Sequence, residues 1–186
     1  VELGASLAVA GTLAGMMSIT ALIMRPIAAV ASDRLNRKKL MIIATTVIGL
    51  SVLGYSISMN MVMLFIFRII HGSAFAISGT ANMSFATNFI PDDKMGSGLG
   101  YLTLGNIVAG AFGPTVGLEL GSAVGYRYVY IISGVLALIA AAGMLMIPYN
   151  HVVSDEQKKR KIVLSDLIEP SLIPYAFLIG MFSLAN

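Results

Sequence analysis

Two residues with chemically active side chains, Arg68 and His71, stand inside a long apolar stretch of the sequence, residues 61–89. A charge at the centre of a bilayer is unfavourable by roughly 2.5 kcal/mol or more, so such a residue normally faces a cavity or a partner. The guanidinium of an arginine can bind an anionic group, and a histidine can titrate near physiological pH and carry a proton. These residue types at this spacing therefore indicate a polar pathway.

The other polar positions of the stretch share a helical face with these two. Positions 68, 71, 75, 78 and 82 follow one face of an α-helix and are polar except for Phe75. A helix entering the membrane at Met61 would place Arg68 about 10 Å deep and His71 about 15 Å deep. Arg68 then needs water, backbone carbonyls, an anionic substrate group or an acid as its partner. The predicted pathway-lining residues, two of them on a later stretch, are Arg68, His71, Ser78, Asn82, Asn106 and Glu119.

Catalytic and metal-binding chemistry finds little support in the sequence. The chain has no cysteine, which excludes disulfides and thiolate ligands, and its two histidines argue against a multi-histidine metal site. Only His71 with Ser73 or Ser78 pairs a base with a nucleophile, and these residues fit a cavity lining equally well. A proton-carrying carboxylate must be Glu119, lie outside this chain or be absent, because no acid falls at mid-membrane. We expect no enzyme activity, no cofactor and no metal.

The composition is that of an integral membrane protein. Of the 186 residues, 57% are apolar and 11% charged, whereas a soluble domain carries about 25% charged residues. The mean hydropathy is +0.86. The net charge of +3 does not indicate nucleic-acid binding, because the bases lie in loops beside the membrane and form no stripe. The sequence begins inside one apolar stretch and stops inside another, which predicts that it is part of a longer protein.

Six apolar stretches are candidates for membrane-spanning helices, which need about 20 residues each. The first is interrupted by Arg25-Pro26, where we expect a bend, and the last is cut off at Asn186. The expected fold class is therefore an all-α integral membrane protein with six visible transmembrane helices. The stretches cover about 3–32, 40–58, 61–89, 96–120, 128–148 and 172–186.

The basic residues fall almost entirely on one side of this topology. Nine of the twelve lie in the loops 33–39, 90–95 and 149–169, whereas Arg127 alone lies on the opposite side. Because positive loops stay in the cytoplasm, this asymmetry places the three loops inside. The 149–169 loop contains two capping-box patterns, which predict one or two short helices beside anionic lipid headgroups; a disordered basic linker is the alternative.

The first of these loops, with the helix end before it, reads R-P-I-A-A-V-A-S-D-R-L-N-R-K-K-L over residues 25–40. We expect a turn at Leu35-Asn36, since asparagine tolerates a left-handed backbone. The spacing resembles the signature loop of the major facilitator superfamily, where a small residue precedes an Asp by four positions and bases follow. The family most often has Gly where this chain has Ala29. The matching positions are Ala29, Asp33, Arg34, Asn36, Arg37, Lys38 and Lys39.

Two further motifs carry the same resemblance. Stretch 61–89 is similar to the family's helix 4 pattern at Leu64, Arg68 and Gly72, with His71 in place of the usual Gln. Stretch 96–120 is similar to the helix 5 motif of the antiporter branch. Small residues four apart let helices touch in lipid and proline bends a helix, so this motif suits a surface that rocks against another; ordinary glycine-rich packing is the alternative. The positions are Gly100, Ala109, Gly113, Pro114 and Gly117, with departures at Ala109 and Leu118, where the motif has glycine.

The resemblance implies a twelve-helix fold built from inverted three-helix repeats, of which this chain holds helices 2 to 7. It divides the chain into a transmembrane bundle at 1–148, a central loop at 149–169 and the start of helix 7 at 170–186. Asp33 would act as a conformational latch against a helix N-terminus in the other half. The implied protein is a monomer in the plasma membrane. It would export small organic or drug-like substrates by alternating access, with protons as the coupling ion.

Other activities stay open at this point. An importer of sugars or other small metabolites would use the same fold and the same motifs. A membrane sensor that transports nothing, or an enzyme embedded in the membrane, has less support from the residues. The motifs define a family more closely than they define a substrate or a direction of transport.

Overall fold

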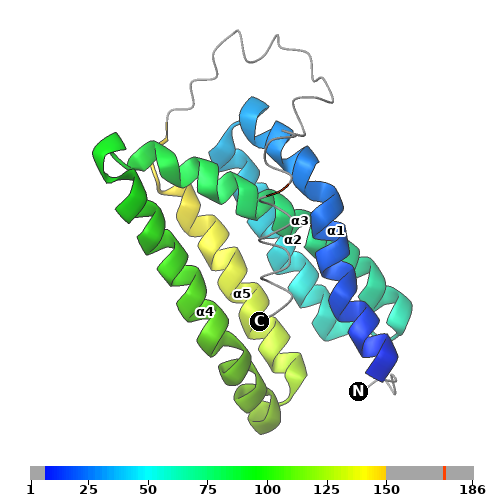
Figure 1. Cartoon of the computed structure of the whole chain (residues 1–186). Helices are drawn as coiled ribbons and strands as arrows, with labels where there is room; N and C mark the ends of the chain where they lie inside the picture. The colour runs from blue at the N-terminus through cyan, green and yellow to red at the C-terminus, as the bar shows by residue number, and fades with distance from the viewer. Residues whose placement is uncertain (1–6, 150–173, 175–186) are drawn as a thin grey trace. The chain divides into compact units, whose positions relative to one another are not determined.

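The computed structural model describes residues 7–149 and 174, and every regular element in this part of the chain is a helix (Figure 1). Two single 3₁₀ turns, η1 (Thr87–Phe89) and η2 (Asp92–Lys94), connect the third long helix to the fourth. The five long helices are all long and apolar enough to cross a membrane, which confirms the all-α membrane fold class. They are α1 (Leu7–Arg34), α2 (Arg37–Ile57), α3 (Met61–Ala86), α4 (Met95–Val124) and α5 (Tyr126–Leu145).

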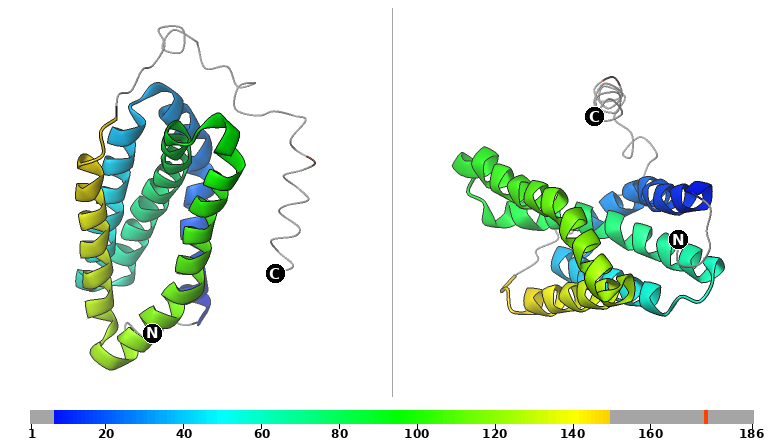
Figure 2. Two further views of the ribbon diagram at one scale, coloured as in Figure 1. Left: turned by 90° about the vertical axis from the view of Figure 1, so that its left-hand side faces the viewer. Right: turned by 90° about the horizontal axis from the view of Figure 1, so that it is seen from below.

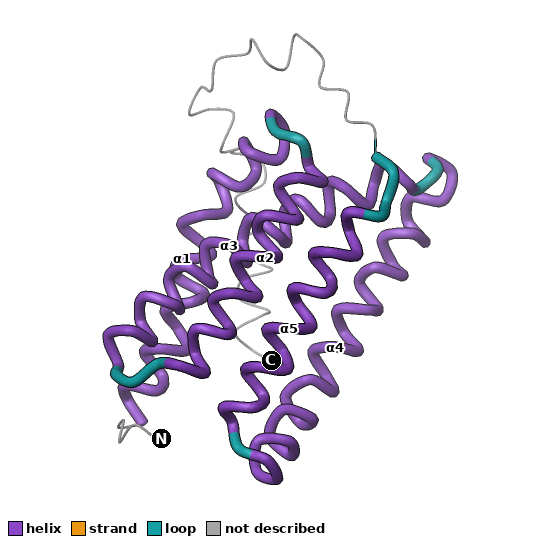
Figure 3. The backbone as a smooth tube through the Cα atoms, turned by 180° about the vertical axis from the view of Figure 1, so that it is seen from behind, coloured by secondary structure: helices purple, strands orange, loops and turns teal. Residues whose placement is uncertain are grey.

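Asparagine side chains cap the N-termini of two of these helices, α2 and α3. Asn36 Oδ1 accepts a hydrogen bond from the Lys39 backbone N–H at 3.0 Å, and Asn60 Oδ1 accepts one from Met63 N–H at 2.9 Å. An N-cap oxygen of this kind satisfies a backbone donor that the first helical turn leaves unpaired. The prediction of a left-handed turn at Asn36 is wrong, since its φ is −63° and its backbone is extended. The connections that precede these two helices are short (Figure 3).

The helices pack through a few close approaches. α3 lies along both α1 and α2, α2 lies along α5, and α4 packs mainly beside α5 (Figure 2). At Gly72 in α3, a Cβ atom would lie 2.8 Å from the carbonyl oxygen of Met17 in α1. Gly49 in α2 and Gly134 in α5 approach each other in the same way, with a Cβ on Gly49 3.1 Å from the Gly134 oxygen. Small residues permit such contacts between membrane helices.

Several predicted helix boundaries need correction. α1 continues through Pro26 as one helix, and the bend expected at Arg25-Pro26 stays a prediction. Proline removes one helical donor, but membrane helices tolerate it because neighbouring groups satisfy the freed carbonyl. α5 begins at Tyr126, directly after Gly125, whose φ of +95° permits the sharp reversal from α4. The sixth predicted helix and the two capping-box patterns lie outside the described residues.

Candidate functional site

Tyr55 lies at the centre of a group of aromatic and basic side chains from α2, α3 and α5. Its ring is 5.8 Å from the His71 ring, 6.2 Å from Phe67 and 5.5 Å from Tyr130, measured between centroids. We call Tyr55, Phe67, Arg68, His71 and Tyr130 the Tyr55 cluster. Tyr55 itself is only 8% exposed. The cluster therefore surrounds one buried phenol with partly buried side chains, where the end of α2 meets the beginning of α3.

Arg68 finds its partners on α1 and α2. Its guanidinium lies over the Tyr55 ring, 5.2 Å from the centroid, and one terminal nitrogen is 3.6 Å from the Met17 sulfur. A cation over an aromatic face is stabilised by about 0.5–2 kcal/mol, more where water is excluded. Among the described residues, no carboxylate forms an ion pair with Arg68. An aromatic face and a thioether were not among the partners that the sequence led us to expect.

His71 is paired with a phenol and not with a serine. Its Nδ1 lies 3.0 Å from the Tyr55 hydroxyl. Ser73 instead donates to the Ile69 carbonyl at 2.9 Å, and Ser78 lies 3.5 Å from Thr45 Oγ1. The His71 pairings with Ser73 or Ser78 considered from sequence are therefore not formed in the part of the chain that the structure describes.

The remaining predicted pathway residues are not gathered with the Tyr55 cluster. Phe75 and Asn82 on α3 are exposed, whereas Ser78 turns toward α2. On α4, Asn106 and Glu119 are exposed, and Asn106 donates only to the Leu102 carbonyl of its own helix, at 3.3 Å. Within residues 7–149, the structure thus unites Arg68 and His71 and leaves the α4 residues apart from them. A lining role for the whole set stays a prediction.

The basic loop, residues 33–39, ties together the ends of three helices. Arg37 donates to the Ser32 carbonyl at 3.2 Å and to the Ser84 carbonyl, near the end of α3, at 3.0 Å. Lys38 Nζ donates to the carbonyls of Leu145 and Ile147 at the end of α5, at 3.0 and 2.6 Å. Helix C-termini carry partial negative charge and unpaired carbonyls, so these bases are well placed. Arg37 and Lys38 therefore act as structural caps.

The other residues of the loop motif are distributed around these caps. Asp33 and Lys39 are exposed, Arg34 is half-buried, and Ala29 is exposed one turn earlier on α1. The carboxylate of Asp33 thus stands at the surface of a loop whose neighbouring bases are fixed. Its predicted role as a latch is compatible with this position and stays a prediction.

An aromatic group lies beside the same helix ends. The rings of Phe85 and Phe89 are 4.9 Å apart, and that of Tyr149, after the end of α5, lies 4.8 Å from Phe85 and 6.2 Å from Phe89. Phe85 is buried and belongs to a small apolar core with Met41. Aromatic pairs at these distances stabilise a contact by about 0.5–1.5 kcal/mol beyond the area they bury. The chain is therefore anchored at Tyr149.

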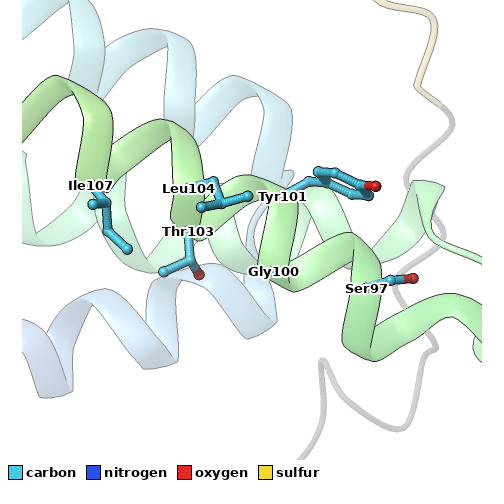
Figure 4. A pocket seen from close by; sticks show the side chains of 6 residues that line it. All are labelled: Ser97, Gly100, Tyr101, Thr103, Leu104 and Ile107. Atoms are coloured by element: carbon cyan, nitrogen blue, oxygen red, sulfur yellow. The ribbon is translucent and has the colours of Figure 1, made fainter.

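The helix 5-like motif lies on α4 in open surroundings. A Cβ atom at Gly100, Gly113 or Gly117 would meet nothing within 4 Å among the described residues. Ala109 and Pro114 are exposed, with Pro114 inside the helix. A shallow pocket near the start of α4 is formed by that helix alone (Figure 4), and its lining residues are Ser97, Gly100, Tyr101, Thr103, Leu104 and Ile107.

Sequence reasoning missed Tyr55, because it looked for partners of Arg68 by charge and by spacing along one helix. The short connection Ser58–Asn60 was the available signal, since it forces the end of α2 to lie beside the first turns of α3. An aromatic residue in the last turn of α2 was thus positioned to reach Arg68 and His71.

A multi-pass helical bundle with a charged, hydrogen-bonded cluster inside it is the architecture of a membrane transporter. Comparison with protein families identifies which one: the model of the Major Facilitator Superfamily matches residues 1–185. The chain belongs to the Major Facilitator Superfamily, which confirms the resemblance of its loop and helix motifs. It is accordingly a multi-pass membrane protein of a transporter family and not an enzyme.

Curated relatives include the multi-drug resistance efflux pump PmrA of Streptococcus pneumoniae serotype 4 and the pump of the same name from strain R6. Each is 27% identical to this chain over 132 residues, which is 71% of this chain and 33% of the relative. The chain thus spans about a third of the length of the curated relatives it matches.

Proposed function

We propose that this chain belongs to a longer secondary transporter that exports small organic, drug-like compounds by alternating access, with protons as the coupling ion. The family supports transport, and the name of the PmrA relatives supports efflux of drugs. The chain supplies one helix before the basic loop and several after it, and the rest of the proposed twelve-helix monomer lies outside these 186 residues. The substrate site lies between the two halves of that monomer.

The observation that carries the proposal is a contrast within the basic loop: two of its bases are hydrogen-bonded to backbone carbonyls, whereas its carboxylate is exposed. Arg37 and Lys38 are held by carbonyls of α1, α3 and α5, so the loop has a fixed shape. Asp33 is exposed beside them. A carboxylate presented on a rigid loop suits a contact with the positive N-terminus of a helix in the other half, made in one transport state and released in the next.

The test is Asp33→Asn in the longer protein, with ethidium efflux measured in bacterial cells that lack their own drug exporters. A carboxylate at a helix N-terminus contributes up to about 2 kcal/mol, so we expect the efflux rate to fall by about tenfold. The amount of protein in the membrane should not change. Asp93→Asn, in the connection between α3 and α4, is the matched control and should retain the wild-type rate.

Two outcomes would overturn parts of the proposal. Wild-type efflux in Asp33→Asn would exclude the latch. Energy-dependent uptake of the dye by cells carrying the wild-type protein, in place of its extrusion, would exclude export. Proton coupling is tested in proteoliposomes, where an imposed pH gradient alone should drive ethidium movement.

A further inference from the structure

We propose that Tyr55 is a positioning residue: it holds His71 as the tautomer protonated at Nδ1 and so makes Nε2 the proton-accepting atom of the ring. The tautomer is an inference about the fold of this chain. Its consequence for transport rests on the proposed function above.

The argument begins with the single proton of the Tyr55 hydroxyl. That oxygen lies 3.0 Å from His71 Nδ1 and 3.4 Å from the carbonyl oxygen of Phe67. Tyr55 is 8% exposed, so its hydroxyl has little access to water, and a buried polar group is normally hydrogen-bonded. A carbonyl can only accept, whereas a phenol can donate one bond and accept others.

Only one arrangement satisfies both contacts. If the phenol donates to the Phe67 carbonyl, His71 must carry its proton on Nδ1 and donate to the phenol oxygen. If the phenol donates to Nδ1 instead, the contact with Phe67 is left without a hydrogen. In a neutral imidazole one nitrogen donates and the other accepts, so the first arrangement leaves the lone pair on Nε2. The hydrogen bond that one ring nitrogen makes therefore decides whether the other nitrogen carries a proton or can accept one.

The surroundings of His71 supply donors but no competing acceptor for Nδ1. Arg68, on the same helix, only donates, and its guanidinium is held over the Tyr55 ring. From α5, Tyr130 packs its ring against Tyr55, and from α1 the Met17 thioether contacts Arg68. Among the described residues no polar atom bonds to Nε2. Tyr55 thus connects the two active side chains of α3 and fixes the orientation of both.

The direct test is ¹⁵N NMR of the detergent-purified protein with labelled histidine, at a pH where His71 is neutral. Signals lost in His71→Asn identify the residue. We expect a pyrrole-type Nδ1 and a pyridine-type Nε2 in the wild type. In Tyr55→Phe, which keeps the ring and loses the hydroxyl, the signals should shift toward the Nε2–H tautomer that a neutral histidine side chain prefers in water. Tyr130→Phe is the matched control, because the Tyr130 hydroxyl has no hydrogen bond among the described residues, and it should change nothing.

The outcomes of the NMR experiment are decisive. An Nε2–H tautomer in the wild type, or unchanged signals in Tyr55→Phe, would overturn the proposal. This readout needs no transport, so it separates the tautomer from the proposed function. If the tautomer is found and the wild-type protein moves no dye, the function fails and the positioning role stands.

The consequence for transport is tested by rates. In metal sites, losing the partner that orients a histidine ligand typically lowers activity 10- to 100-fold. By the same reasoning, Tyr55→Phe should lower the maximal ethidium efflux rate by about tenfold while the half-saturating concentration stays unchanged. His71→Gln, whose amide reaches the position of Nε2, should retain more activity than His71→Asn, whose amide reaches only Nδ1. Full activity in Tyr55→Phe, or the reverse order of the two His71 variants, would contradict a role for Nε2.

Discussion

Three glycines of α2, α3 and α5, namely Gly49, Gly72 and Gly134, and the glycines in the middle of α4 occupy opposite environments. Gly72 lies against the backbone of α1, and Gly49 lies against that of Gly134. In α4, Gly105, Gly110 and Gly113 have nothing within 4 Å of a Cβ position among the described residues. Both regions have the small residues that let membrane helices touch, but of these glycines only those of the first region make such contacts within the described residues. A glycine-rich helix in a sequence therefore indicates a surface available for packing and does not identify its partner.

The strongest way to break this comparison is Gly72→Ala. The new methyl group would meet the Met17 carbonyl at 2.8 Å, and backbone cannot move aside as a side chain can. Overpacking of this kind destabilises by about 1–3 kcal/mol. We expect a clearly lower melting temperature in detergent. Gly79→Ala, on the same helix and in open space, is the control and should leave it unchanged. Equal melting temperatures for the two variants would mean that the α1–α3 contact is not as close as described.

Gly49→Ala should have a smaller effect at the α2–α5 contact. Its Cβ would meet the Leu138 side chain at 2.9 Å and the Gly134 carbonyl at 3.1 Å, and the leucine can adjust. We expect a loss near the lower end of the same range, about 1 kcal/mol. Gly143→Ala, in open space on α5, is the control. Because both glycines serve one contact, the double variant Gly49→Ala/Gly134→Ala should depart from the sum of the single effects; strict additivity would argue against a shared contact.

Lys38→Gln tests how much the basic loop contributes to the stability of the packed helices α2, α3 and α5. The substitution removes two hydrogen bonds to carbonyls at the end of α5, but water can replace donors at this exposed site. The expected destabilisation is below about 1 kcal/mol. Lys39→Gln changes the same charge at an exposed position and serves as the control. A larger loss of melting temperature in Lys39→Gln than in Lys38→Gln would refute the capping role.

Gly113→Ala should have the smallest effect on stability and sharpens the comparison most. Among the described residues the added methyl group would meet nothing within 4 Å, so in a chain limited to residues 1–186 the melting temperature should not fall. In the longer transporter, where we expect other helices to cover this face, the same substitution should lower ethidium efflux. Destabilisation of the short chain would show that α4 is already packed there, and unaltered efflux would show that the face stays uncovered.

The sequence was sufficient for the fold because that signal is carried by long runs of residues. About 20 apolar residues and a one-sided distribution of bases define each span and its ends, and three motifs in order define the family. The basic loop was found by its spacing. The roles of Arg37 and Lys38 were not, because the carbonyls that they bind, on Ser84 and Leu145, are backbone atoms that carry no sequence signal.

The Tyr55 cluster was only half predictable. Arg68 and His71 stand out because a charge in an apolar stretch is rare. Tyr55 does not, since an aromatic residue in a membrane helix is ordinary and its importance depends on the crossing of α2 and α3. The turn at Asn36 was mispredicted for a related reason, because asparagine serves equally well as an N-cap and as a left-handed residue, and the following helix decides between them.

The stacking of Tyr149 on Phe85 and Phe89 has a mechanical consequence for whatever follows it in the chain. A linker explores a volume set by its length and by where its first residue is fixed. Here that origin lies beside the ends of α3 and α5, the same place where Lys38 joins α5 to the basic loop. Any segment that follows Tyr149 therefore starts from this point. Tyr149→Ala would remove the stacking and move that starting point back to the end of α5.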